Sequence, residues 1–334
     1  MIIHLKNNVS KEKAMSLAKE NQAMIFKQDD YYALVTTSKM KELPGALASE
    51  TQDYFVLSSD IQLASRDYQP DLREVAMGEK EIKVGGTLNK TMMITGPCSI
   101  ESWDQIKQCA ELLKELNITT LRAGCFKPRT SPYSFQGLGH EGLEMLVKIR
   151  EEYGFNIITE VKDSSHVDAV IEHSDIVQIG AKAMYDQSIL QRCGESDKPV
   201  LLKRGFGTTL QEFVQAAEFI LSRGNNKVML CERGIRTFET HTRFTLDLCG
   251  VSFLKEHTNL PVIVDPSHAM GYRYGVPDLT RAATAMGVEG LLIETHPTPD
   301  TAKSDAAQQL NFDQFREMYQ TLQPIAAAVG KELF

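Results

Sequence analysis

The 334-residue chain carries a formal net charge of -8 at pH 7, and 42% of its residues are hydrophobic while 24% are charged. These proportions are typical of a globular protein with a sizeable core. The length suggests roughly two domains, although a single barrel of about 250 residues is also common. The acidic balance, without an extended basic face, argues against a nucleic-acid partner.

The sequence contains no run of about 18 apolar residues, so we expect no membrane-spanning segment. The first six residues, MIIHLK, contain no long apolar region of the kind found in a secretory signal. The six cysteines include no CxxC pair and suggest no disulfide framework. We therefore expect reduced thiols and a cytoplasmic protein.

The N-terminal part alternates between strand and helix patterns. We predict strands at 2–6, 23–27, 31–36 and 54–57, and helices at 10–21 and 38–48. The resulting β-α-β-β-α-β order is that of a ferredoxin-like domain. Few of its residues are suited to catalysis, so we interpret residues 1–70 as an accessory domain that is regulatory or oligomer-forming. A polar connection at 71–90 follows it.

From residue 91 the pattern changes to short apolar strands separated by amphipathic helices. We predict strands at 92–95, 119–122, 157–160, 176–179, 200–203, 228–231, 262–265 and 291–294. The helices fall at 103–116, 141–153, 165–173, 186–193, 210–223, 242–257, 277–286 and 312–329. This alternation predicts a (β/α)8 TIM barrel over residues 91–334. An open doubly wound sheet is the alternative, but no GxGxxG follows the first strand.

Polar residues stand at or just beyond the ends of the predicted strands. They are Cys98, Arg122, Glu160, Gln178, Lys203, Glu232, Arg233, Asp265 and Glu294. In a barrel these strand ends share one face, and active sites lie on that face. The sequence therefore predicts a functional site built from several strands.

One loop of this face is unusually cationic. Residues 122–137 read RAGCFKPRTSPYSFQG, and no Asp or Glu occurs from 121 to 140. The stretch contains Arg122, Lys127 and Arg129 and follows a predicted strand, which suits binding of a phosphorylated small molecule. A solvated basic loop without a ligand is the alternative.

Four residues suggest a divalent metal site. Cys98 lies in GPCS after the first barrel strand, His268 lies in DPSH, Glu294 ends the eighth strand, and Asp305 follows it. A mixed sulfur, nitrogen and oxygen set suits Mn, Fe, Co or Zn better than Mg. Taken singly, Cys98 could be a small buried hydrophobe and His268 a hydrogen-bonded loop histidine. His296 competes with His268 as a ligand. Strand alternation points it the same way as Glu294, so we retain it either as a residue that supports a metal ligand or as a substrate contact.

The charges around the predicted site indicate anionic substrates. Six cations surround it: Arg122, Lys127, Arg129, Lys182, Lys203 and Arg233. In a partly dry site these would repel one another strongly unless anions entered. A phosphate monoester carries about -1.5 to -2 at neutral pH. Two phosphorylated substrates, one of them also a carboxylate, would balance the site.

Several motifs together resemble one enzyme family. They are GPCSIES at 96–102, KPRTSPYSFQG at 127–137, CERG at 231–234, DPSH at 265–268, and ETH at 294–296 with SD at 304–305. From about residue 91 to the end, the chain resembles 3-deoxy-D-arabino-heptulosonate 7-phosphate (DAHP) synthases of the short type I subfamily. These are related to 3-deoxy-octulosonate 8-phosphate synthases, which usually carry a Lys-Ala-Asn-Arg type run in place of KPRT. The N-terminal part resembles the ferredoxin-like domain of some members.

The resemblance implies a metal-dependent condensation of phosphoenolpyruvate with D-erythrose 4-phosphate. This reaction gives DAHP and phosphate and opens the shikimate pathway to the aromatic amino acids. The implied metal ligands are Cys98, His268, Glu294 and Asp305, and Cys98 and His268 are also counted as catalytic. The implied contacts to phosphoenolpyruvate are Arg122, Lys127, Lys182, Lys203 and Arg233. Arg129 and Thr130 would hold the sugar phosphate, and Asp265 and His296 would contact substrate. Lys127 would donate a proton, and Glu160 would position a water molecule.

Some positions depart from the family pattern. Lys182 stands where Arg is usual and loses bidentate geometry toward a phosphate. Ala123, Thr295 and Ala306 also differ from the residues expected there. None of these changes removes a predicted ligand, so they bear on affinity or substrate detail rather than on reaction class.

Three rival functions remain open at this point. An octulosonate- or sialate-type synthase would use the same enol donor with a longer sugar, such as arabinose 5-phosphate for the octulosonate type. A Schiff-base aldolase would use Lys203, and a metabolite sensor would keep the barrel without catalysis. We further hypothesise that the N-terminal domain binds Phe or Tyr as a feedback inhibitor and that the chain forms a homo-oligomer, a dimer or a tetramer.

Overall fold

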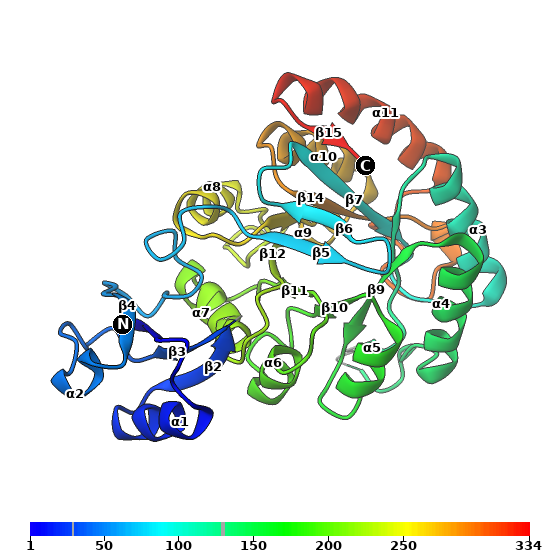
Figure 1. The fold of residues 1–334 in the computed structure, drawn as a ribbon. Coiled ribbons are helices and arrows are strands. Elements are labelled where there is room, and N and C mark those ends of the chain that lie inside the picture. Colours follow the sequence, from blue (N-terminus) through cyan, green and yellow to red (C-terminus); the bar gives the residue numbers. More distant parts are fainter. Residues whose placement is uncertain (29, 128–130) are drawn as a thin grey trace.

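A barrel with a smaller sheet beside it makes up the computed structural model, which describes residues 1–28, 30–127 and 131–334 (Figure 1). Within this range, eight parallel strands pair in chain order and the last pairs with the first. They are β7 (Lys90–Gly96), β8 (Thr120–Arg122), β9 (Asn156–Val161), β10 (Ile176–Ile179), β11 (Val200–Lys203), β12 (Val228–Glu232), β13 (Val262–Val264) and β14 (Gly290–Glu294). The predicted (β/α)8 barrel is confirmed, and closure excludes the open sheet.

Helices surround the barrel. They are α3 (Trp103–Glu115), α4 (His140–Tyr153), α5 (Val167–His173), α6 (Gln187–Gly194), α7 (Leu210–Leu221), α8 (Leu248–His257), α10 (Val276–Ala285) and α11 (Phe312–Ala328). Two 3-10 turns, η1 (Arg273–Gly275) and η2 (Pro299–Thr301), lie in the late loops. Among the described helices, none combines the length and apolar character needed to span a membrane.

Two local signals change the predicted helices. The helix predicted at 242–257 begins only at Leu248, because the Asp247 side chain accepts a hydrogen bond from Gly250 N and caps it there. A short helix that was not predicted, α9 (Pro266–Met270), follows β13. Asp265 caps it, and Pro266 occupies its first turn, where a missing N–H costs nothing. Residues 242–247 therefore form a loop at the mouth of the barrel.

Both faces of the barrel strands are buried. Ile94, Ile158 and Leu201 belong to a cluster inside the barrel, whereas Leu121 and Val177 pack with the helices outside it. Strands buried on both faces read as continuous apolar runs. This explains why all eight were recognisable in the sequence.

The segment predicted as a polar connection contains a hairpin. Strands β5 (Glu74–Met77) and β6 (Ile82–Gly85) pair antiparallel, and Val75, Met77 and Val84 pack into the cluster inside the barrel. The hairpin thus covers the amino-terminal end of the barrel, opposite the strand ends that carry the polar residues. Strand β15 (Glu332–Leu333) pairs with β7 beside it. The hairpin was not predicted because each strand has only four residues and the charged turn at 79–81 makes the segment polar overall.

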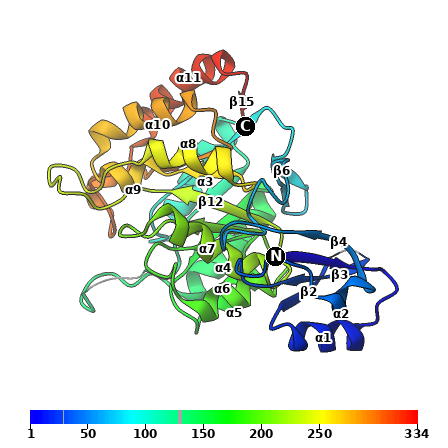
Figure 2. The ribbon, with the colours of Figure 1, turned by 90° about the vertical axis from the view of Figure 1, so that its left-hand side faces the viewer.

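The N-terminal sheet has the strand order β2-β3-β1-β4 and is antiparallel. Its strands are β1 (Ile2–Leu5), β2 (Met24–Gln28), β3 (Tyr31–Val35) and β4 (Thr51–Phe55), and its helices are α1 (Lys11–Glu20) and α2 (Gly45–Ala48). This arrangement fits the predicted ferredoxin-like fold. The helix expected at 38–48 is reduced to its last turn, since Pro44 precedes the first residue of α2. Figure 2 shows the sheet at one side of the barrel.

A buried carboxylate on α7 connects this side of the barrel to the segment that follows the N-terminal sheet. Glu218 Oε1 accepts hydrogen bonds from Gln62 N at 2.7 Å and Ala64 N at 2.8 Å, and Oε2 accepts one from Leu63 N at 3.1 Å. Gln62 in turn donates to Thr36 O at 2.7 Å. One side chain therefore fixes three consecutive backbone groups of the connecting segment.

Glu218 predicts a pH-dependent stability. Burial raises the pKa of Glu218 to about 7, although the three backbone N–H groups act to lower it. A carboxyl whose pKa is raised on folding binds its proton more tightly in the folded state, so stability falls as pH rises from its ordinary pKa through about 7. Glu218→Gln cannot titrate at this position. Relative to that variant, the free energy of unfolding of the wild type should fall by on the order of 3 kcal/mol between about pH 5 and pH 8.

Denaturant unfolding of both proteins across this pH range measures the difference. Glu212→Gln, an exposed substitution on the same helix, should leave the wild-type pH dependence unchanged over this range. Parallel stability curves for the wild type and Glu218→Gln would contradict the prediction.

Candidate active site

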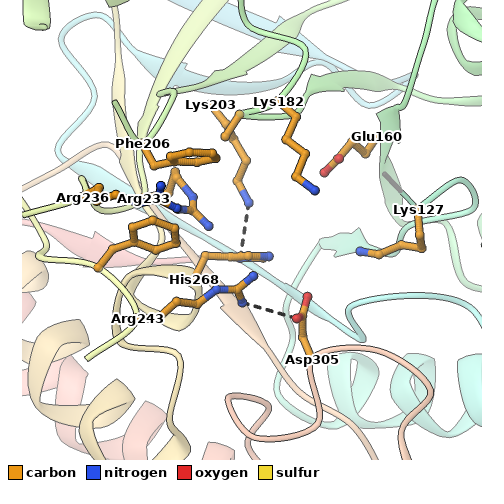
Figure 3. Close-up of a pocket in the computed structure, with 12 residues that line it drawn as sticks. Lys127, Glu160, Lys182, Lys203, Phe206, Arg233, Arg236, Arg243, His268 and Asp305 are labelled. Atoms are coloured by element: carbon orange, nitrogen blue, oxygen red, sulfur yellow. Dashed lines mark hydrogen bonds and ion pairs between the residues drawn. The ribbon is translucent and has the colours of Figure 1, made fainter. Parts of the chain in front are cut away.

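A cavity of about 460 Å³ opens where the strands of the barrel end (Figure 3). It is lined by Lys127, Glu160, Ala181, Lys182, Lys203, Phe206, Arg233, Arg236, Arg243, Phe244, His268 and Asp305. Among these described residues, six are Lys or Arg and two are carboxylates. The cavity therefore has the positive excess that anionic ligands require.

The four predicted metal ligands lie together beside this cavity. One ligand atom from each of Cys98, His268, Glu294 and Asp305 lies within 4.8 Å of all the others. Cys98 Sγ is 3.1 Å from Asp305 Oδ2, and His268 Nε2 is 3.5 Å from Glu294 Oε1. Donor atoms around a tetrahedral ion with bonds of about 2.1 Å lie about 3.4 Å apart, so the spacing suits a metal.

The surroundings of these atoms also suit a cation. Glu294 Oε1 is buried and makes no hydrogen bond, although Arg122 Nη1 lies 3.0 Å away. Burial raises the pKa of the Cys98 thiol to about 12, and Glu294 adds to the rise. A thiol in such a place becomes a thiolate when a metal ion replaces its proton. The donor set of one sulfur, one nitrogen and two carboxylates fits Mn, Fe, Co or Zn.

Asp265 orients His268 toward the cluster. Its Oδ2 accepts hydrogen bonds from His268 Nδ1 at 2.8 Å and Lys203 Nζ at 2.5 Å, and its Oδ1 accepts one from His268 N at 2.9 Å. Burial alone would raise the pKa of Asp265, but His268 and Lys203 hold it well below its usual range. With Nδ1 bonded to Asp265, Nε2 remains available as the ligand atom. Asp265, predicted as a substrate contact, is fully buried behind these two residues.

Two other predicted substrate contacts lie outside the cavity lining. Arg122 is buried and donates to Pro97 O at 2.5 Å while lying beside Glu294. His296 accepts a hydrogen bond from Thr298 N at 3.0 Å through Nδ1, and its Nε2 is 3.7 Å from Glu101. Strand alternation does not extend to His296, because β14 ends at Glu294. His268 and not His296 joins the cluster.

The remaining predicted residues divide into three groups. Lys127, Glu160, Lys182, Lys203 and Arg233 line the cavity as expected. Lys127 Nζ lies 3.0 Å from Cys98 Sγ, and Glu160 Oε2 accepts a hydrogen bond from Gln178 Nε2 at 2.5 Å. Glu232 instead lies behind the site, where it pairs with Arg204 at 2.8 Å. Arg129 and Thr130 lie outside the described residues.

One wall of the cavity, aromatic and cationic, was not predicted from the sequence. Phe206 and Phe244 stack at 5.4 Å, Arg233 lies over Phe244 at 4.4 Å, and Arg236 lies over Phe206 at 4.9 Å. Such contacts hold guanidinium groups in place while leaving their edges available to anions. The sequence signal that could have indicated this wall was the high density of Arg and Phe in residues 233–244. It was obscured because part of that loop was assigned to a helix.

A (β/α)8 barrel with an ion-binding cluster and a cationic cavity at the carboxyl ends of its strands defines a class of metal-dependent enzymes acting on anionic substrates. The model of the DAHP synthetase I family matches residues 73–330. The chain belongs to the DAHP synthetase I family.

Individual relatives agree with this assignment. The chain is 44% identical over 269 residues to a phospho-2-dehydro-3-deoxyheptonate aldolase from Thermotoga maritima, covering 80% of this chain and 78% of that protein. It is 32% identical over 278 residues to a 2-dehydro-3-deoxyphosphooctonate aldolase from Syntrophotalea carbinolica, covering 78% and 98%. The octulosonate-type relative is thus the more distant of the two.

Solved structures give the same result. The crystal structure of the Thermotoga maritima DAHP synthase matches with a TM-score of 0.80 at 37% identity and covers 100% of this chain and 99% of that one. A truncated form of the Thermotoga maritima synthase matches with a TM-score of 0.76 at 39% identity, covering 83% and 100%.

The role of Asp265 can be tested by Asp265→Asn. Loss of the carboxylate removes the group that fixes the tautomer and direction of His268, so metal affinity should fall about 10- to 100-fold. Competition with a chromophoric chelator measures the dissociation constants for Mn²⁺ and Zn²⁺. Asp278→Asn, an exposed substitution paired with Arg281, should leave them unchanged. Equal affinities in Asp265→Asn and wild type would refute the role.

Proposed function

We propose that this chain condenses phosphoenolpyruvate with D-erythrose 4-phosphate to give DAHP and phosphate, the first step of the shikimate pathway. One observation carries the proposal: the cationic cavity adjoins the four-ligand cluster, and Lys127 lies at their junction, 3.0 Å from Cys98 Sγ. Similarity to the Thermotoga maritima enzyme supports the same reaction.

Cys98, His268, Glu294 and Asp305 would hold a divalent ion, either Mn, Fe, Co or Zn. When bound, such an ion supplies Lewis-acid polarisation of the aldehyde carbonyl. The burial of Cys98 and Glu294 keeps water away from this side of the cavity and strengthens every charge interaction there.

Cations on one side of the cavity would bind phosphoenolpyruvate. Lys203, held by Asp265, and Arg233, held over Phe244, project into the cavity with Lys182 near them (Figure 3). Fixed positive groups of this kind orient a phosphate and a carboxylate without later reorganisation. Arg122, buried beside Glu294, would neutralise the charge of that carboxylate. Arg129 and Thr130 remain proposed contacts for the sugar phosphate on the motif alone.

The proton transfers are assigned to two residues. As carbon 3 of the enol attacks the aldehyde carbon, Lys127 donates a proton to the forming alkoxide. Glu160 then positions a water molecule that adds to carbon 2, and it takes up the proton that this water releases. The resulting hemiketal phosphate loses inorganic phosphate to form the keto acid. Gln178 keeps Glu160 directed toward the cavity.

The rival reactions are less well supported. Lys203 Nζ is buried and lies 2.5 Å from the Asp265 carboxylate, so its nitrogen is already engaged and is poorly placed to attack a substrate carbonyl. The octulosonate-type relative is 32% identical, against 44% for the DAHP-type relative. Every metal-ligand position and cavity cation among the described residues is filled by a competent group, which disfavours a silent sensor.

We also propose residues 1–70 as an accessory domain, 71–90 as its connection and 91–334 as the catalytic barrel. The accessory domain would bind Phe or Tyr as a feedback inhibitor, and the chain would assemble as a dimer or tetramer. The position of the N-terminal sheet beside the barrel, on a segment fixed by Glu218, supports this proposal.

Titration of the full-length protein with Phe and with Tyr tests the binding of an inhibitor. Light scattering tests the assembly as a dimer or tetramer.

Substrate choice and metal dependence test the proposed reaction. With Mn²⁺ present, consumption of phosphoenolpyruvate should require erythrose 4-phosphate, with kcat/KM at least about 100-fold above that for arabinose 5-phosphate. Prior chelation should abolish activity, and added Mn²⁺ should restore it. A preference for arabinose 5-phosphate would favour the octulosonate reaction, and full activity after chelation would exclude a metal role.

Glu160→Gln tests the water-positioning step. The substitution keeps the size of the side chain but removes the proton acceptor, so kcat should fall about 100- to 10,000-fold. Metal affinity should remain near the wild-type value, because Glu160 is not a member of the ligand cluster. Glu141→Gln, at an exposed site on α4, serves as the matched control in the steady-state assay. Wild-type kcat in Glu160→Gln would remove this residue from the mechanism.

A further inference from the structure

A continuous set of hydrogen bonds links two of the proposed metal ligands. Gln308 Nε2 donates to Glu294 Oε2 at 2.6 Å, and Gln308 Oε1 accepts from Arg243 Nη1 at 2.7 Å. The same Arg243 nitrogen lies 3.3 Å from Asp305 Oδ1. Glu294, Gln308, Arg243 and Asp305 thus form one chain, part of which is visible in Figure 3.

This chain determines which oxygen of each carboxylate faces the cluster. Glu294 has Oε2 bonded to Gln308, and its Oε1 points toward His268 Nε2 at 3.5 Å. Asp305 has Oδ1 bonded to Arg243, and its Oδ2 lies 3.1 Å from Cys98 Sγ. In both residues one carboxylate oxygen is hydrogen-bonded to the chain Gln308–Arg243. The other oxygen faces the remaining ligand atoms, where an ion would bind.

The orientation of the Gln308 amide is also fixed. Its carbonyl accepts from a guanidinium, which has only donors, and its NH2 group donates to a carboxylate, which has only acceptors. A flipped amide would place like groups together at both ends. Gln308 is 1% exposed, so water cannot replace either partner easily.

Arg243 is anchored to the rest of the site by its backbone. Its N–H donates to Met270 O at 3.1 Å, and Phe244 N donates to Ala269 O at 2.9 Å. Met270 and Ala269 belong to α9, the helix that carries His268. The loop that carries Arg243 is therefore packed on the element that supplies a third ligand.

We propose that Arg243 and Gln308 are positioning residues, together termed the carboxylate clamp, that present Glu294 and Asp305 to the metal ion and set its affinity. The inference rests on the proposed metal site. The clamp holds the two carboxylates in order before the ion binds. Metal binding then does not have to overcome the loss of their conformational entropy. It also places a positive charge behind two negative ligands, which lowers their mutual repulsion in the metal-free protein.

Metal affinity of the full-length protein tests the clamp independently of catalysis. Dissociation constants for Mn²⁺ and Zn²⁺ are measured by chelator competition for wild type, Arg243→Met, Gln308→Leu and the double variant. Each single variant should bind about 10- to 100-fold more weakly. The double variant should bind about as weakly as the worse single one, because the two residues act in series. Arg243→Lys, which keeps a positive donor, should recover part of the affinity.

Arg273→Met is the matched control. Arg273 holds the same loop as Asp305 through Ala306 O at 2.9 Å but touches no proposed ligand side chain. The metal affinity of the Arg273→Met protein should stay within about twofold of that of the wild type. Circular dichroism of the metal-free variants checks folding. The Arg243 side chain is 39% exposed, so Arg243→Met should fold. The measurement on Arg243→Met therefore decides the proposal even if Gln308→Leu is unstable.

The contrary outcomes are distinct. Wild-type affinity in Arg243→Met, with only KM for the substrates raised, would overturn the clamp and make Arg243 a substrate-binding residue. Equal weakening in Arg273→Met would also overturn it, because the position of the loop would then be the cause. Failure of the wild type itself to bind either ion would overturn the metal site and the clamp together.

Discussion

The pairing of β14 with β7, which closes the barrel, is the constraint on which the site depends. Its register places Glu294 opposite Gly96, and Cys98 follows two residues later. Two ligands far apart in the chain thereby become neighbours at the carboxyl ends of adjacent strands. Closure is in turn stabilised by the apolar cluster inside the barrel, which includes Met92 and Leu292. The hydrophobic core thus positions the proposed metal site.

Beside the cavity, two buried ion pairs keep opposite charges in contact. Lys203 lies against Asp265, and Arg204 against Glu232, with each pair almost fully buried. Buried pairs of this kind add little net stability, but loss of one partner leaves an uncompensated charge. They are better understood as devices that fix geometry. Among the described residues that line the cavity, six Lys or Arg side chains stand against two carboxylates, and anionic substrates would balance this positive excess.

Much of this arrangement could be predicted from the sequence, and the failures have physical causes. The barrel strands were recognisable because both of their faces are buried, and polar residues at their ends indicated the site. Arg243 was missed because a local cap, Asp247, delays the start of α8 and leaves a loop where helical periodicity had suggested a helix. Glu232 and His296 follow the strand-end rule in sequence but turn away from the cavity, since their orientation depends on tertiary partners that no short segment specifies.

X-ray absorption spectroscopy of the zinc-loaded protein tests the central claim most directly. We expect one sulfur neighbour at about 2.3 Å together with nitrogen and oxygen neighbours at about 2.0–2.2 Å. Replacement of Cys98 by Ser should remove the sulfur contribution and leave the lighter neighbours. A wild-type spectrum without sulfur, or one that keeps its sulfur in the Cys98→Ser protein, would show that the ion binds elsewhere.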